Sequence, residues 1–152
     1  MTPRAVFERL ITGITNGRWS ELADLYAEDA VVDTPLMAPE PRQLVGREAV
    51  RAQFAAAAAG AYELRARNIR VHETTDPEVV IAEFDYDITF TPTGARLTAA
   101  NVQLLRVREG RIVATRDYHD HLRLAAVSGR VEELAKAVTA TVTTGQAAAG
   151  VS

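Results

Sequence analysis

The sequence predicts an α+β domain in which a curved antiparallel sheet, shaped like a cone, wraps around helices that come first in the chain. Two patterns carry this prediction. Apolar residues recur at helical spacing over the first 60 residues, and the period then changes to two over four consecutive stretches. Short connections join these stretches, which makes neighbouring strands antiparallel. We expect a pocket inside the cone, which is open at one end.

The first part of the chain shows the spacing of helices, interrupted by one short strand. Thr2 can cap a helix that begins at Pro3, because Pro is favoured in a first helical turn, and Asn16-Gly17 supplies the stop. Apolar residues recur on one face of this helix. The elements expected after it are a short helix over 19–27, a strand over 31–34, a Pro-rich loop over 35–41 and a helix over 47–59.

The rest of the chain alternates like strands before it returns to helical spacing. Turn-forming residues separate the alternating stretches, for example Asp76-Pro77 and Glu109-Gly110. The expected strands cover 63–72, 79–91, 97–108 and 111–118, and the expected last helix covers 131–140. Small and polar residues dominate the end of the chain. We therefore expect one domain over 1–142 and a flexible tail over 143–152.

Composition excludes several classes of protein. The 152 residues carry 17 basic and 20 acidic side chains, a balance that argues against a nucleic-acid partner. There is no Cys, so disulfides and thiolate chemistry are impossible. No apolar stretch is long enough to cross a membrane, and no signal-peptide core precedes the first helix. We therefore expect a cytoplasmic protein that has neither a nucleic-acid nor a membrane partner.

Three stretches carry a resemblance to a known superfamily. Residues 25–35 read LYAEDAVVDTP, residues 46–50 read GREAV, and residues 109–120 read EGRIVATRDYHD. Over about residues 4–124 the chain resembles the nuclear transport factor 2-like superfamily. Its members include ketosteroid isomerases, SnoaL-like polyketide cyclases and limonene-epoxide hydrolases, and the last stretch is most similar to the latter two branches. The resemblance implies the cone fold, which hosts enzymes, binding modules and assembly proteins alike.

The resemblance to ketosteroid isomerases does not extend to most of their site residues. The position of the carboxylate base is Thr34, and a Thr hydroxyl does not abstract a proton from carbon near neutral pH. The position of the oxyanion-hole Tyr falls on Leu10, and that of the protonated Asp falls on Gln103. Of that family's polar network, Tyr26 alone is retained.

Limonene-epoxide hydrolases and SnoaL-like cyclases both place an Asp in the last strand, and Asp117 matches it. In the hydrolase pattern Asp85 and Asp33 match further polar positions, but Glu83 stands where an Arg would bridge two acids. If Glu83, Asp85 and Asp117 shared a dry pocket, like charges would raise the pKa of at least one of them. The cyclase pattern needs only Asp117, as its acid–base residue.

Asp117 is the first catalytic candidate. The strand face that carries it also carries Arg111, Val113 and Thr115. If this face lines the cone, burial raises the pKa of Asp117 into the range useful for proton transfer. The alternative is a strand-end Asp that pairs with a neighbouring Arg.

Asp85 and Asp33 are further catalytic candidates whose orientation the sequence leaves open. Glu83, Asp85 and Asp87 alternate with apolar residues, which is typical of a strand whose acids face water. The family match instead points Asp85 into the pocket, and strand parity alone does not decide between the two. Asp33 is either a second pocket acid or a strand-end turn residue.

Four residues are candidates for substrate binding: Tyr26, Asn101, Gln103 and His119. Asn101 and Gln103 share a strand face, from which they either bind a substrate oxygen or satisfy buried neighbours. Tyr26 is otherwise a core residue with a satisfied hydroxyl. His119, beside Asp117, is suited to pass protons at the mouth of the pocket.

No metal or cofactor is expected. His119 and His121 lie on opposite strand faces if the segment is extended, and His72 is the one further imidazole. Trp19 and Phe54 stand at core spacings, and we assign them to packing.

Two functional hypotheses follow. In the first, the chain is a SnoaL-like enzyme that isomerises, cyclises or hydrolyses an apolar, polyketide- or terpenoid-like small molecule by general acid–base catalysis. In the second, it is a non-catalytic module that binds a hydrophobic ligand or serves in an assembly. In both, apolar residues on both faces of the sheet predict a homodimer that pairs through the sheet.

Overall fold

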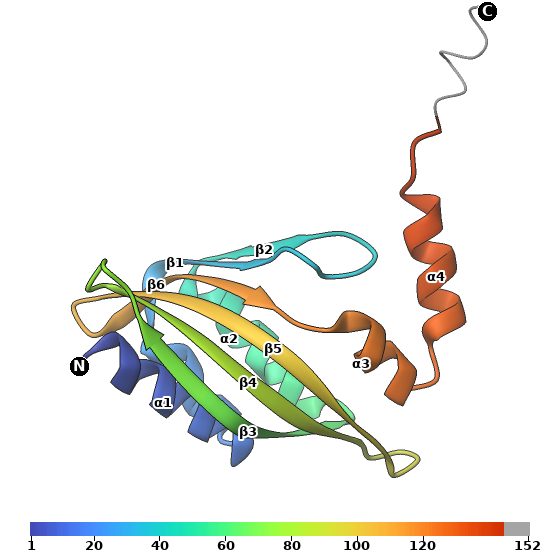
Figure 1. The fold of residues 1–152 in the computed structure, drawn as a ribbon, viewed down its shortest axis with the longest axis horizontal. Coiled ribbons are helices and arrows are strands. Elements are labelled where there is room, and N and C mark those ends of the chain that lie inside the picture. The colour runs from blue at the N-terminus through green and yellow to red at the C-terminus, as the bar shows by residue number, and fades with distance from the viewer. Residues whose placement is uncertain (145–152) are drawn as a thin grey trace, which may run out of the picture.

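Helix α1 (Pro3–Thr15) begins and ends where the sequence predicts. Thr2 Oγ1 accepts a hydrogen bond from the Ala5 backbone N–H at 3.2 Å, and Gly17 follows the helix with a φ of +67°. The computed structural model describes residues 1–144, in which α1 packs its apolar side against a six-stranded sheet (Figure 1). Phe7 of this helix meets Phe84 of the sheet with ring centroids 5.8 Å apart.

The second expected helix is shorter than predicted and is a 3-10 helix, η1 (Trp19–Leu25). Strand β1 (Tyr26–Thr34) follows without a loop and therefore begins five residues before the expected strand. Trp19, Leu22 and Leu25 recur every three residues, which is the repeat of a 3-10 helix rather than an α-helix. Tyr26 has an extended backbone and is buried, so its side chain belongs to the sheet.

The strands expected in the second half form the predicted meander. The strands are β3 (Tyr62–Glu73), β4 (Val79–Phe90), β5 (Ala95–Arg108) and β6 (Arg111–Tyr118). Consecutive members pair antiparallel, and the full order across the sheet is β2-β1-β6-β5-β4-β3.

The sheet is mixed rather than wholly antiparallel, which corrects the sequence prediction. Strand β1 runs parallel to β6, with Val32 opposite Thr115. Short turns determine the direction of the meander strands only. Strands β1 and β6 are neighbours in the sheet but are far apart in the chain. No short turn joins them, so the direction of β1 relative to β6 is not constrained by a hairpin. The sheet is open, and β2 (Arg42–Val45), which the sequence pattern did not predict, forms its edge beside β1.

Helix α2 (Arg47–Ala59) has the predicted bounds and packs against η1 and β1. With α1 it covers one face of the sheet (Figure 1). Side chains on this inner face of β4 and β5 are buried, and those on the outer face are half-buried or exposed. The space between the helices and the inner face is therefore where both core and pocket form.

Two helices follow the sheet. Helix α3 (His121–Val127) was not predicted; Asp120 caps it by accepting a hydrogen bond from the Arg123 backbone N–H at 3.0 Å. Helix α4 (Val131–Ala140) has the predicted bounds, buries none of its residues and projects from the body (Figure 1). The tail expected over 143–152 lies, from residue 145 on, outside the described residues. No helix within 1–144 is long and apolar enough to span a membrane.

Candidate functional site

A cavity of about 390 Å³ lies between the helices and the inner face of the sheet. Elements from both ends of the chain build it, from α1 and η1 to β6 and the start of α3. Its wall is mostly apolar and rich in aromatic rings. The aromatic and imidazole side chains that line it are Trp19, Tyr26, Phe54, Tyr62, Tyr86, His119 and His121.

Asp117 lines this cavity from β6, as the sequence predicts. It stands directly opposite Gln103 of β5, whose Nε2 donates a hydrogen bond to Asp117 Oδ1 at 2.7 Å. Burial raises the pKa of Asp117 to about 6; the Gln103 amide and the Thr115 hydroxyl oppose the rise, and the charge of Asp33 adds to it. Asp117 is therefore a carboxyl group that can both take and return a proton near neutral pH.

The strand face that carries Asp117 differs from the expected one in its first half. Thr115 and Asp117 face inward as expected, but Ile112 is buried in place of Arg111 and Val113, and Arg111 is exposed. The register between β5 and β6 shifts at this point, because an extra residue in β6 forms a bulge. The bulge lies before Thr115, so the inward direction of Asp117 is unaffected.

Two buried tyrosines line the same cavity. Tyr26 was a candidate from the sequence, and Tyr86 of β4 was not. Burial, followed by the nearby charge of Asp117, raises the pKa of both hydroxyls. Both therefore stay protonated and can donate hydrogen bonds to a ligand. Tyr86 follows Phe84 and precedes Ile88 on the inner face of β4, so strand alternation could have identified it.

Asn101 and His119 form a second polar pair. His119 Nδ1 lies 2.8 Å from Asn101 Oδ1, and Asn101 Nδ2 donates to the Ala99 carbonyl at 3.1 Å. Asn101 and His119 both line the cavity. Burial lowers the pKa of His119 to about 4, so this imidazole is neutral at physiological pH.

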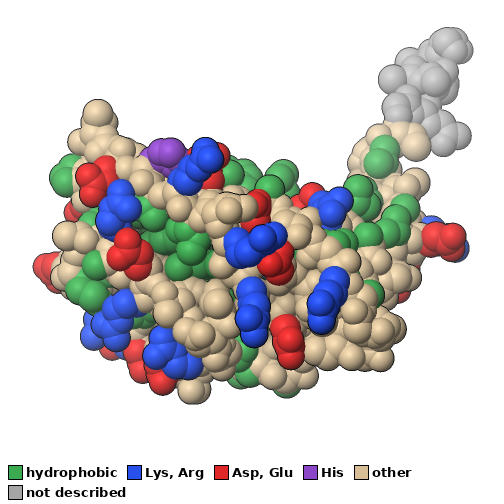
Figure 2. All heavy atoms as spheres, turned by 60° about the horizontal axis from the view of Figure 1, so that its bottom comes forward, with side chains coloured by type: hydrophobic (Ala, Val, Ile, Leu, Met, Phe, Trp, Pro, Cys, Tyr) green, Lys and Arg blue, Asp and Glu red, His purple; other side chains and the backbone are tan. Residues whose placement is uncertain are grey.

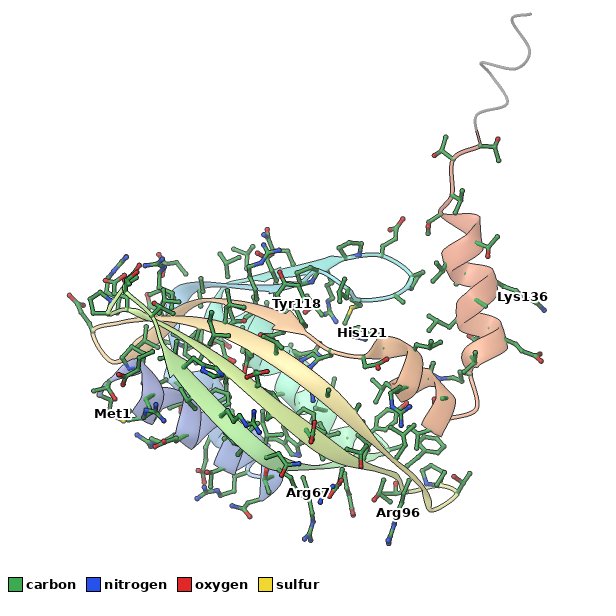
Figure 3. The ribbon with its side chains drawn as sticks, in the orientation of Figure 1. Met1, Arg67, Arg96, Tyr118, His121 and Lys136 are labelled. Atoms are coloured by element: carbon green, nitrogen blue, oxygen red, sulfur yellow. The ribbon has the colours of Figure 1, made fainter. Side chains whose placement is uncertain are left out.

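His119 and His121 lie on the same cavity wall, not on opposite faces of an extended segment. Strand β6 ends at Tyr118, and the chain turns into α3 at Asp120. The two imidazole centroids are 6.2 Å apart, and His121 sits at the start of α3 (Figure 3). Among residues 1–144, no group of three or more His, Asp or Glu side chains is arranged to hold a metal ion.

Asp85 lies outside the cavity, on the outer face of β4. Its Oδ2 accepts a hydrogen bond from Asn68 Nδ2 at 2.8 Å. The neighbouring acids pair in the same way with β3, Glu83 with His72 and Asp87 with Arg67. Oppositely charged side chains stand side by side over the surface in Figure 2. The placement of Asp85 inside the pocket is thus wrong, and the half-exposed strand is correct.

Asp33 also lies outside the cavity. Its neighbours Val32 and Thr34 line the cavity from β1, so Asp33 points to the other face by strand alternation. Gln43 Nε2 donates to its Oδ1 at 2.8 Å, and Arg116 lies 3.8 Å from its Oδ2. Its influence on the site is electrostatic, through the raised pKa of Asp117.

Trp19 and Phe54 pack as predicted, and they also form part of the cavity wall. Their ring centroids are 6.2 Å apart, and Phe54 lies 6.0 Å from the ring of Tyr26. This aromatic group suits a flat apolar ligand, which it would contact face or edge on.

Comparison with known proteins decides the family. The model of the SnoaL-like domain matches residues 7–115, which is most of the chain. The chain belongs to the SnoaL-like family. This SnoaL-like chain is also 28% identical over 139 residues to an uncharacterised PhzA/B-like protein of Pseudomonas aeruginosa, covering 91% of this chain and 98% of the relative.

Solved structures share the fold of this SnoaL-like chain. A protein from Bacillus subtilis described as a candidate isomerase superposes with a TM-score of 0.76 at 23% identity, covering 83% of this chain and 91% of the other. A candidate polyketide cyclase from Xanthomonas campestris gives a TM-score of 0.71 at 18% identity, with coverages of 82% and 94%. At these identities the likeness shows the fold. Asp117 lies two residues beyond the matched family range of 7–115, so its assignment rests on the geometry of this SnoaL-like chain.

Proposed function

We propose that the protein is an enzyme that isomerises, cyclises or hydrolyses a mainly apolar small molecule in the cavity, with Asp117 as its acid–base group. The observation that carries the proposal is the carboxyl group of Asp117, whose pKa is raised to about 6 by burial among apolar walls. The related folds described as cyclase and isomerase support the same class of reaction.

Isomerisation and cyclisation both begin with proton abstraction from a carbon next to a substrate carbonyl. The charged form of Asp117 takes the proton, and the electron pair of the broken C–H bond moves toward the carbonyl oxygen. The protonated hydroxyls of Tyr26 and Tyr86 are the donors suited to stabilise that oxygen. In isomerisation Asp117 then returns the proton to another atom of the substrate. In cyclisation the carbanion instead forms a bond to the carbon of a second carbonyl in the same ligand, and the oxygen of that carbonyl takes the proton from Asp117.

Burial suits Asp117 to this role because a catalytic base is most effective with a pKa near the working pH. A solvated Asp, with a pKa near 4, is a weaker base than the same group with a pKa near 6. Gln103 holds the carboxyl group in one orientation through its 2.7 Å hydrogen bond. The proposed acid–base step uses these residues of the chain.

Solvent deuterium exchange tests the proposal without knowledge of the natural substrate. The bicyclic ketone 2-tetralone fits an aromatic-lined cavity and has exchangeable protons next to its carbonyl. We expect the wild type to speed deuterium incorporation from heavy water, and Asp117→Asn to lose this acceleration by about 100-fold or more. Asp85→Asn, on the outer face of β4, is the matched control and should retain it. A ketone that binds without any exchange in the wild type would support the alternative, a hydrophobic ligand-binding module.

A further inference from the structure

The orientation of the Asn101 amide is determined by its own strand. Asn101 is buried, with 5% of its surface exposed, and the neighbour of one amide atom is the Ala99 carbonyl oxygen at 3.1 Å. A carbonyl oxygen only accepts hydrogen bonds, so the amide atom that faces it is the donor Nδ2. The acceptor Oδ1 of Asn101 is left to face His119 at 2.8 Å.

This orientation determines the tautomer of His119. Because Asn101 Oδ1 only accepts, the hydrogen between the two side chains belongs to His119 Nδ1. The ring is neutral, since burial holds its pKa at about 4. A neutral imidazole carries one N–H hydrogen, so Nε2 of His119 has a lone pair and no hydrogen.

His119 Nε2 has no hydrogen-bond partner within residues 1–144. The nearest rings are Tyr86 and His121, whose centroids lie 6.4 Å and 6.2 Å from that of His119. The ring lines the same cavity as Asp117. The atom is open to the cavity rather than fully buried, since the fully buried unpaired side-chain atoms in residues 1–144 are Thr115 Oγ1 and His121 Nε2. A ligand that replaces cavity water there binds more tightly when it brings a donor to this nitrogen.

We propose that His119 is a specificity-determining residue whose Nε2 accepts a hydrogen bond from a hydroxyl or N–H group of the ligand. Substrates of the proposed reaction then carry such a donor on their apolar framework. A ligand with an ether or carbonyl oxygen at that point is rejected, because two acceptors face each other. Asn101 is a positioning residue that keeps the hydrogen on Nδ1. The inference uses the cavity of the proposed function but does not depend on turnover.

A pair of probes of similar shape tests the preference for a donor. The probes are 2-naphthol and 2-methoxynaphthalene, whose dissociation constants are measured by fluorescence with the full chain. We expect the wild type to favour 2-naphthol over the ether by about tenfold more than His119→Phe does. The Phe variant keeps a planar ring, so apolar packing of both probes is retained. Equal preference in wild type and variant, or no binding of either probe to the wild type, would overturn the proposal.

A second measurement reads the tautomer in the ligand-free protein. Long-range ¹H–¹⁵N correlations distinguish a protonated from a bare ring nitrogen, and we expect His119 to show a protonated Nδ1 and a bare Nε2. Asn101→Leu, which removes the acceptor but keeps the shape, should lose this tautomer and reduce the preference for 2-naphthol. A protonated Nε2 in the wild type would contradict the proposal. Failure of deuterium exchange with a retained probe preference would instead refute the proposed catalysis alone.

Discussion

Gln103 and Asp117 face each other across strands β5 and β6, and the Gln103 amide donates to Asp117 Oδ1 at 2.7 Å. This neutral donor orients a carboxyl group whose pKa is raised to about 6 by burial. A cationic partner in the same place would hold the pKa of Asp117 low and leave a weak base. The neutral partner therefore permits the raised pKa while it fixes the geometry.

Removing the Gln103 donor should raise the pKa of Asp117 further. In Gln103→Leu the charged form of Asp117 loses its hydrogen bond while the apolar surroundings remain. We expect the pKa of Asp117 to rise from about 6 to about 7, as measured by an NMR titration of the carboxyl carbon. Gln43→Leu, which removes the matching amide from Asp33, should leave the Asp117 pKa unchanged. An unchanged pKa in Gln103→Leu would contradict this role.

Asp117→Asn should stabilise the protein at neutral pH. The folded pKa of Asp117 lies above its unfolded value, so its ionisation costs stability, and the cost grows as the pH rises from about 4 to 6 and stays constant above that. Two pKa units correspond to at most about 3 kcal/mol, and we expect a gain of about 1–2 kcal/mol at pH 7. Urea melts from pH 4 to pH 8 measure it. A gain that does not shrink toward pH 4 would contradict the assignment.

The lowered pKa of His119 should change the stability of the protein with pH in the direction opposite to that of Asp117. Its folded pKa is lowered, so the folded protein resists protonation and loses stability as the pH falls from about 6.5 to 4. The effects of Asp117 and His119 therefore partly cancel in the wild type across this window. His119→Phe removes this loss, so in urea melts the stability of the variant relative to the wild type should increase as the pH falls from about 6.5 to 4. An unaltered pH dependence would show that His119 is not the group involved.

We propose that two copies of the chain pair through the outer face of the sheet. Val102 and Leu104 are half-buried on that face of β5, and Tyr118 of β6 lies opposite Val102. Light scattering should give about 33 kDa, twice the 16.5 kDa chain. Leu104→Arg should shift the mass toward 16.5 kDa, and Arg9→Glu on α1 should not. A wild-type particle of one chain mass at micromolar concentration would refute the pairing.

We expect the Asp120 cap of α3 to contribute both to the stability of the protein and to ligand binding in the cavity. Asp120 Oδ1 accepts from the Arg123 backbone N–H, and its neighbours His119 and His121 both line the cavity. Asp120→Ala should cost about 1 kcal/mol in urea melts and weaken binding of 2-naphthol. Thr2→Ala removes the cap of α1 at a similar cost and should leave binding unchanged, because that cap lies away from the cavity. Equal binding in both variants would show that α3 does not position the site.

Periodicity predicted the meander and α1, α2 and α4 well, because each of these segments has one clear apolar repeat. Periodicity failed where the residues of a short segment fit two kinds of secondary structure. Trp19, Leu22 and Leu25 fit a helix, but their exact spacing of three belongs to a 3-10 helix that ends before Tyr26. Helix α3 was missed although Asp120 is a good cap, because its seven residues are too few to show a clear helical repeat.

The candidate site was predictable where strand parity and resemblance agreed. Both placed Asp117 inside, and Asn101 and Gln103 share its cavity. At Asp85 the two disagreed, and the apolar alternation of β4 proved the better guide because burying an acid beside Asp117 is costly. The contact between Asn101 and His119 could not be foreseen, since it depends on the turn from β6 into α3.

The pH dependence of deuterium exchange into 2-tetralone tests the role of Asp117 most directly. Asp117 must be charged to abstract a proton, so the exchange rate in the wild type should rise with pH, with a midpoint at about 6, and level off above it. Asp117→Asn should show no such step. A wild-type rate without a step near pH 6, or the same step in Asp117→Asn, would contradict the account.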